Sequence, residues 1–209
     1  MTADNTWTYL LASELSNIRP SEFIFYYHCL HGLTTDSVVE HMQGVLGAYS
    51  PDMVVMQVGI VDCYPRAVTK KEAAIASRIP LLGKLTHRLV RKYYRELIMA
   101  RNISYVDIKS FEKNNRAIFD FYEGVEMIVI PIAPPNDRFS EKNPAVRSQV
   151  IKYNDILQKI YGERFLDSAF SYANLEEIFL SDNYHLSERG NRLLVDCLIK
   201  KCKSRFCRA

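Results

Sequence analysis

Three apolar runs, separated by stretches of helical periodicity, constrain the fold of this 209-residue chain most strongly. The runs are EFIFYYHCL (22–30), DMVVMQVGI (52–60) and VEMIVIPIAPPN (125–136). The second and third runs do not alternate between apolar and polar residues, which is typical of parallel strands that are covered by helices on both faces. Each run ends at or close to a glycine or a proline, so a turn is expected there. These runs therefore predict three strands of a mostly parallel sheet.

The remaining segments carry apolar residues three and four positions apart, a spacing that predicts helices. We expect helices over 7–15, 34–49, 83–102, 144–162 and 187–206, and a short last strand over 164–170. Strands that alternate with helices predict an α/β fold, a three-layer sandwich of flavodoxin-like type around a central parallel sheet. No internal repeat or linker divides the chain, so we expect one domain over 1–209, with a helical insertion at about 66–123.

Composition excludes several classes of protein. The apolar content of 48% suits a folded domain, and the formal charge of +3 is too small to indicate nucleic-acid binding, so no nucleic-acid partner is expected. The five cysteines are dispersed and odd in number, which favours reduced thiols. No apolar run approaches the roughly 20 residues that span a bilayer, and the first residues lack a signal-peptide pattern. A cytoplasmic location is expected by default.

Candidate functional residues lie at the ends of the predicted strands, where ligands collect in parallel sheets. They are His28, His31 and Gly32 after the first run, Gly59, Asp62 and Arg66 after the second, the segment 134–138 after the third, and the pair Asp182 and His185 before the last helix. Because these positions share one edge of the sheet, we expect them to converge.

The stretch SDNYHLSERGN (181–191) places Asp182 three residues before His185. A histidine titrates near neutral pH and can take a proton from a nucleophile, while an aspartate fixes its tautomer and stabilises its charged form. This pattern indicates half of a catalytic site that lacks its nucleophile.

Together, HGLTT (31–35), VGIVDCYPR (58–66) and SDNYHLSERGN resemble, in this order, the SGNH (GDSL-type) hydrolase superfamily of esterases, lipases and acyltransferases. The resemblance covers nearly the whole chain. It implies a serine mechanism on an acylated saccharide or polysaccharide, with no cofactor and no metal. It also implies His185 as general base, Asp182 as its orienting partner and Gly32 as an oxyanion donor.

We expect Gly59, Asp62 and Arg66 to lie on the substrate side of this site. Asp62 is expected to bond to backbone amides of its own loop. Arg66 is expected either to pair with Asp62 or to clamp an anionic substrate.

Two departures from the family pattern stand out. The family's Gly-x-Asn-Asp block is Gly59, Ile60, Val61 and Asp62 here, so a hydrocarbon replaces an oxyanion donor whose loss costs about 100-fold to 1000-fold in rate. The GDS serine and its strand, which should precede the helix at Trp7, are also missing.

Three explanations for the missing serine remain open. A first strand carrying it could be encoded upstream, the protein could be an inactive relative that only binds, or another serine could substitute. The candidate substitutes lie inside predicted helices or beside the dyad: Ser13, Ser16, Ser37 and Ser181.

Other features have simpler interpretations. A metal site built from His28, His31, Asp62, Asp182 and His185 lacks the tight ligand spacing of known motifs, so no metal is expected. The basic stretch 78–101 is expected to be a solvated face, or else a lid suited to acidic glycans or lipid headgroups. The basic tail 200–209 is expected to be frayed, with reversible membrane contact as an alternative. The sequence leaves the oligomeric state open.

Overall fold

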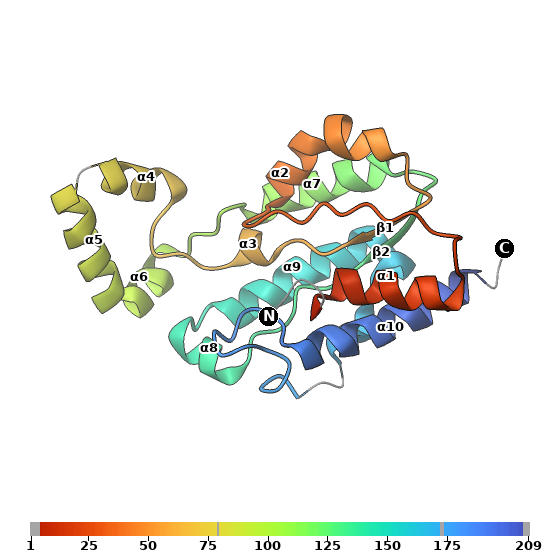
Figure 1. The fold of residues 1–209 in the computed structure, drawn as a ribbon. Coiled ribbons are helices and arrows are strands. Elements are labelled where there is room, and N and C mark those ends of the chain that lie inside the picture. The colour runs from red at the N-terminus through yellow and green to blue at the C-terminus, as the bar shows by residue number, and fades with distance from the viewer. Residues whose placement is uncertain (1–4, 79, 172–173, 207–209) are drawn as a thin grey trace.

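The computed structural model describes residues 5–78, 80–171 and 174–206. A parallel two-stranded sheet lies between two groups of helices (Figure 1). The sheet pairs β1 (Met53–Met56) with β2 (Glu126–Val129). The main helices around it are α1 (Trp7–Ile18), α2 (Thr35–His41), α7 (Ile108–Phe121), α9 (Val146–Tyr161) and α10 (Glu188–Phe206).

Further helices and turns lie between these elements. They are a π-helical turn (Met42–Leu46), α3 (Ile60–Cys63), α4 (Lys70–Arg78), α5 (Pro80–Lys92), α6 (Tyr94–Arg101), α8 (Asp137–Lys142) and 3-10 turns at Gly47–Tyr49, Gly162–Arg164 and Asp167–Phe170. No helix in the described part of the chain is both long enough and apolar enough to cross a membrane.

The core forms two clusters, one on each face of the sheet. Met127 and Val129 belong to the cluster that includes side chains of α2, α7 and α9. Ile128 and Ile130 belong to the cluster that includes side chains of α1 and α10. Successive side chains of a strand point to opposite faces, so a strand covered on both sides must be apolar throughout. This explains the uninterrupted apolar run and confirms the α/β class and both strands.

The predicted strand over 164–170 is wrong in extent. Gly162–Arg164 and Asp167–Phe170 are 3-10 turns, which leaves only two residues between them in an extended arrangement. One isolated parallel bridge joins Phe165 to Val129, and the N–H of Leu166 donates to the carbonyl of Val129 at 2.9 Å. The chain therefore touches the outer edge of β2 without extending the sheet by a full strand.

The predicted strand over 22–30 is also wrong, because this segment is extended but belongs to no sheet. Phe23 and Phe25 pack against the α1–α10 cluster, Tyr26 stacks on Tyr49 with ring centroids 4.4 Å apart, and Ile24 is 82% exposed. Aromatic and branched residues favour an extended backbone, but a strand also needs a neighbour with which to bond. Figure 1 shows the segment running between α1 and α2.

The edge of β1 that faces away from β2 has no partner strand among the described residues. The carbonyls of Asp52 and Met56 accept the N–H groups of Glu126 and Ile130 at 3.3 Å and 2.8 Å. In a parallel pair, every second residue of a strand directs its N–H and C=O groups to the neighbouring strand. The residues between them, here Met53 and Val55, direct these groups to the opposite edge. The sheet is therefore open to a further strand on that side.

The predicted long helix over 83–102 is broken into α5 and α6. Tyr93 leaves the helical conformation (φ −113°, ψ 28°), and this turn brings Ile98 of α6 to a fully buried position. The predicted helix over 34–49 is likewise divided into α2, the π-helical turn and a 3-10 turn. Within the predicted insertion, α7 packs on α2 and α9, whereas α4, α5 and α6 project away from the sheet (Figure 1).

Four of the five cysteines lie in the described residues, and all four are free thiols: Cys29, Cys63, Cys197 and Cys202. Cys207 and the end of the basic tail lie outside the described residues.

Asp62 joins the segment after β1 to the start of α2. Its side chain is fully buried, and its Oδ1 accepts the backbone N–H of Thr35 at 2.8 Å and the hydroxyl of Thr35 at 2.5 Å. The backbone N–H of Asp62 itself also acts on this carboxylate, so the bond expected within its own loop is found in part, and the first turn of α2 supplies the further donors. Burial raises the pKa of Asp62, although the hydrogen bonds from Thr35 oppose that shift.

Asp62→Asn should change how stability depends on pH. The raised pKa means that the folded chain binds this proton more tightly than the unfolded chain, whose aspartate titrates near pH ~4. The contribution of Asp62 to the free energy of unfolding is therefore largest below that pH and falls as pH rises through the folded pKa. We expect the difference in free energy of unfolding, wild type minus variant, to become more positive on acidification in urea titrations.

Asp107→Asn is the matched control. Asp107 caps α7, and hydrogen bonds from Ser110 and Lys109 lower its pKa, so its contribution is lost on acidification. The two differences should change with pH in opposite directions. A pH-independent difference for Asp62→Asn would contradict the prediction.

Candidate active site

Asp182 and His185 form a hydrogen-bonded pair on the loop before α10. His185 Nδ1 lies 2.7 Å from Asp182 Oδ2, and the backbone N–H groups of Tyr184 and His185 donate to Asp182 Oδ1 at 2.9 Å and 3.0 Å. Partial burial raises the pKa of Asp182, but these hydrogen bonds outweigh it, so the pKa is lowered. An ionised Asp182 keeps the proton on Nδ1 and leaves Nε2 of His185 as an acceptor.

Backbone hydrogen bonds hold the loop that carries this pair. The N–H of Leu180 donates to the carbonyl of His185, and the N–H of Ser187 donates to the carbonyl of Ile178, both at 2.8 Å. A Cβ atom at Gly190 would overlap the carbonyl oxygen of Ile178, so glycine permits this close approach. The residues SERGN after the histidine therefore fix where the histidine lies.

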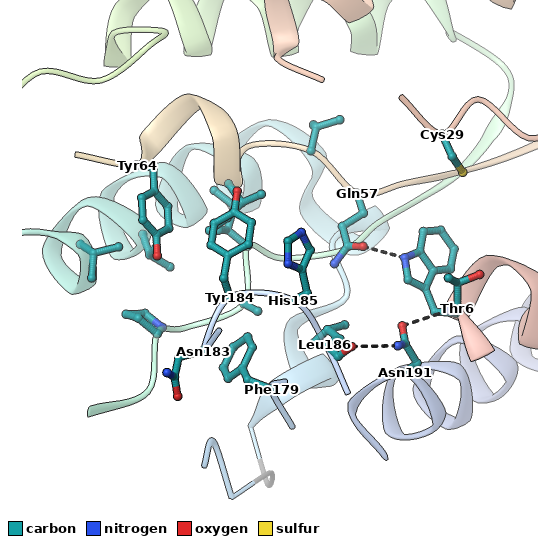
Figure 2. A pocket seen from close by; sticks show the side chains of 18 of the residues that line it. Thr6, Cys29, Gln57, Tyr64, Phe179, Asn183, Tyr184, His185, Leu186 and Asn191 are labelled. Atoms are coloured by element: carbon teal, nitrogen blue, oxygen red, sulfur yellow. Dashed lines mark hydrogen bonds between the residues drawn. The ribbon is translucent and has the colours of Figure 1, made fainter. Parts of the chain in front are cut away.

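Trp7, the first residue of α1, connects three segments around the site (Figure 2). Its backbone N–H donates to Asn191 Oδ1 at 3.0 Å, and its indole N–H donates to Gln57 Oε1 at 2.6 Å. Asn191 Nδ2 in turn donates to the carbonyls of Leu186 and Ser187 at 3.3 Å and 2.9 Å. The start of α1, the end of β1 and the start of α10 are thereby held around one space.

That space is a cavity of about 320 Å³, into which His185 points (Figure 2). One part of its wall is aliphatic, with Ile60, Ile132, Val146 and Val150. The other lining residues are Thr6, Trp7, Thr8, Cys29, Gln57, Val58, Tyr64, Ala133, Pro135, Phe179, Asn183, Tyr184, His185, Leu186 and Asn191. A mostly apolar cavity with a few polar groups is typical of small-molecule sites.

Gln57 contributes an amide group to this cavity. Its Oε1 accepts the Trp7 indole N–H, so its Nε2 is the end that remains available as a donor, and no hydrogen bond from Nε2 is found within the described residues. Figure 2 shows Gln57 beside His185. The sequence analysis missed Gln57. A single polar residue in an otherwise apolar strand, VVMQVG, is the signal that could have found it.

The cavity brings together only some of the residues expected from the sequence. His185 lines it, and Gly59 lies between two lining residues, Val58 and Ile60. Gly59 has φ +110°, and a Cβ there would overlap the side chain of Ile132. Among the described residues that line the cavity, Gly32, Asp62 and Arg66 are absent. The roles predicted for these three residues remain predictions.

Arg66 packs against aromatic rings. Its guanidinium lies 4.5 Å from the ring centroid of Tyr105 and 5.5 Å from that of Tyr64, and its backbone forms an antiparallel bridge with Ile103. Within the described part of the chain it makes no ion pair with Asp62, so that alternative is wrong. Arg66 is therefore near the cavity through Tyr64, which lines it.

No serine of the described residues lines the cavity. Ser13 and Ser16 lie in α1, Ser37 lies in α2, and Ser181 lies in a turn. The hydroxyl and thiol side chains that do line it are Thr6, Thr8, Cys29, Tyr64 and Tyr184.

The histidines near the strand ends do not gather around a common point. His28 Nε2 lies 3.3 Å from His41 Nδ1, and neither histidine is among the residues that line the cavity. Across the residues that the structure describes, no group of three or more His, Cys, Asp or Glu side chains could hold a metal ion.

No protein-family model and no curated protein sequence matches the chain. Solved structures are similar to it. An alpha/beta hydrolase enzyme from the metagenome of Lake Arreo, Spain, is 16% identical with a TM-score of 0.64, over 94% of this chain and 80% of that one. A catalytic mutant of an acetylxylan esterase from Geobacillus stearothermophilus is 16% identical with a TM-score of 0.62, over 93% and 80% of the two chains.

The lipase/acylhydrolase from Enterococcus faecalis is 14% identical with a TM-score of 0.55, over 83% of this chain and 72% of that one. At these identities the likeness concerns the fold alone. The chain has an alpha/beta hydrolase-like fold with a small parallel sheet, shared with esterases and acylhydrolases.

Proposed function

We propose that this domain binds an O-acylated small molecule or saccharide in the cavity beside His185 and cleaves or transfers its acyl group. One observation carries the proposal: a histidine oriented by an ionised aspartate points into a mostly apolar cavity. The acetylxylan esterase supports it, because its catalytic mutants replace an aspartate and a histidine that are also three positions apart.

The chemistry assigned to the site is acyl transfer through a serine. The serine oxygen attacks the ester carbonyl while Nε2 of His185 takes its proton, and Asp182 stabilises the resulting imidazolium. The carbonyl oxygen becomes an oxyanion, for which the amide of Gln57 is the proposed donor in place of the family's asparagine. His185 then protonates the leaving alkoxide. Water or a second alcohol repeats the sequence on the acyl-enzyme and releases the acid or a new ester.

We place the nucleophile on a strand that pairs with the open edge of β1. The unpaired backbone groups of Met53 and Val55 support this, because a parallel strand there would end beside Gln57, at the cavity. In the SGNH superfamily the serine lies at the end of such a strand. This proposal retains the strand that carries the serine in the SGNH superfamily, which is a different segment from 22–30, and it retains the layered sheet around that strand.

An acylated saccharide is the proposed substrate class. Trp7, Tyr64 and Tyr184 line the cavity, and such rings present a broad apolar surface with a polar end, which suits the mixed polarity of a sugar ring. The aliphatic wall suits a small acyl group. The solved relative that acts on acetylated xylan supports this class.

The second candidate is a protein that binds the same ligand without turning it over. Two observations favour it: no serine among the described residues lines the cavity, and Val61 stands where the family has its asparagine. The two candidates share the cavity and differ in the presence of a nucleophile.

His185→Ala should abolish hydrolysis of a short-chain aryl ester. Without the imidazole no group at the cavity takes the proton of the nucleophile, so we expect kcat/KM to fall by at least about 1000-fold. The matched control is His31→Ala, which removes an exposed histidine outside the cavity and should leave the rate unchanged. Equal, measurable rates for wild type and His185→Ala would contradict the role proposed for His185, whereas an inactive wild-type chain would favour the second candidate.

A fluorophosphonate probe and peptide mapping distinguish the two candidates. Labelling of a serine in the wild type, and none in His185→Ala, is the result expected of the enzyme. An unlabelled wild-type chain that still binds an acetylated xylo-oligosaccharide by calorimetry would establish the non-catalytic candidate instead.

Gln57→Leu should lower kcat by about 100-fold with little change in KM, because a donor to the oxyanion acts mainly in the transition state. Trp7→Phe keeps the ring but removes the N–H that orients Gln57, so a smaller loss in kcat is expected. Gln43→Leu, at an exposed position of the π-helical turn, is the matched control. A change in KM alone for Gln57→Leu would assign this side chain to ground-state binding.

A further inference from the structure

Charge is divided unevenly between the body of the protein and the helices that project from it. Residues 70–101, which span α4, α5 and α6, contain nine lysines and arginines and two glutamates, a net charge of +7. The whole chain carries +3, so the remaining residues together carry −4. Figure 1 shows these three helices standing away from the sheet and the helices around it. The positive charge is therefore concentrated on one projecting part.

The same three helices expose apolar side chains. Leu85 and Leu89 of α5 are 56% and 47% exposed, Ile75 of α4 is 58% exposed and Met99 of α6 is 59% exposed. Scattered exposed apolar residues are ordinary, but several on one small charged unit indicate an interaction surface.

Leu85 and Leu89 do not lie on the packing face of α5. Among the described side chains of this helix, Gly83, Thr86 and Val90 are the half-buried positions, and a Cβ at Gly83 would overlap the carbonyl oxygen of Ala76 in α4. At 100° per residue, Leu85 and Leu89 lie on another side of the helix, one turn apart. This side has no partner in the described residues that would bury it.

Basic residues lie next to these leucines. Lys84, Arg88 and Arg91 follow a spacing of four and three residues, which makes one row along α5. Within the described part of the chain none of the three forms an ion pair, whereas Arg101 at the root of the projection binds Glu72 at 2.6 Å. The row is therefore available to an external anionic partner.

We propose that α4, α5 and α6 bind the surface of an anionic lipid bilayer, with Leu85 and Leu89 entering the headgroup region and Lys84, Arg88 and Arg91 on the lipid phosphates. A helix with a basic row beside an apolar row is the pattern of interfacial membrane binding. A soluble polyanion would engage the basic row but leave both leucines in water, so the exposed leucines favour the bilayer over an acidic glycan. This inference does not rest on the proposed enzymatic function.

The test is co-sedimentation of the full chain with vesicles of phosphatidylcholine, alone or mixed with phosphatidylglycerol. We expect binding to the mixed vesicles only, weakened by salt. Leu85→Ser with Leu89→Ser, and separately Lys84→Glu with Arg88→Glu, should each weaken binding by at least about tenfold. All four positions are exposed and lie outside the cavity, so the circular dichroism spectrum should be unchanged.

The matched controls are Lys109→Glu with Lys113→Glu on α7, which makes the same charge change four residues apart, and Ile151→Ser, which removes an equally exposed apolar side chain from α9. Both should bind as the wild type does. Absence of binding to the mixed vesicles would overturn the proposal. The proposal would also be overturned if the leucine variant bound unchanged and an acidic polysaccharide displaced the protein from the vesicles. That result would assign the basic row to a soluble polyanion. Concentration-dependent dimerisation through the leucines without vesicle binding would assign the surface to a second copy.

Discussion

The arrangement of the site depends on the two hydrogen bonds that Trp7 donates. A helix begins with N–H groups that have no partner within the helix. Thr6, the residue before α1, makes no side-chain capping bond, and Asn191 from α10 accepts the N–H of Trp7 instead. One side chain therefore caps α1 and, through its amide, binds the carbonyls that follow the histidine loop. The indole of Trp7 extends this connection to Gln57 at the end of β1.

The features that the sequence predicted correctly are those determined by neighbouring residues. The hydrogen bond between Asp182 and His185 spans three positions, while their catalytic role stays a prediction, and the helix and strand patterns of α9, α10, β1 and β2 are local periodicities. The bonds that were missed join distant residues: Gln57 to Trp7, 50 positions apart, and Asp62 to Thr35, 27 apart. No local pattern records such pairings. The segment 22–30 is a second case in which local sequence was not enough. Its composition predicts an extended backbone, but it would form a strand only if a neighbouring strand bonded to it.

The open edge of β1 ends at the cavity. A strand in a layered fold places its carboxyl end at the ligand-binding edge, and β1 delivers Gln57, Val58 and Gly59 there. A further strand beside β1 would bring its own last residues to the same edge. The chemistry available at the cavity therefore depends on what pairs with this edge, while the histidine and the amide are already fixed by hydrogen bonds that do not involve it.

The projecting helices α4, α5 and α6 follow a residue that lines the cavity. That residue is Tyr64, and the two ends of the projection are joined by the bridge between Arg66 and Ile103 and by the bond from Arg101 to the carbonyl of Ala67 at 2.9 Å. Ile98 of α6 is fully buried close to this root, and the two bonds hold the first and last residues of the projection to each other. The helices α4, α5 and α6 are thus connected to the cavity wall through the short segment that follows Tyr64.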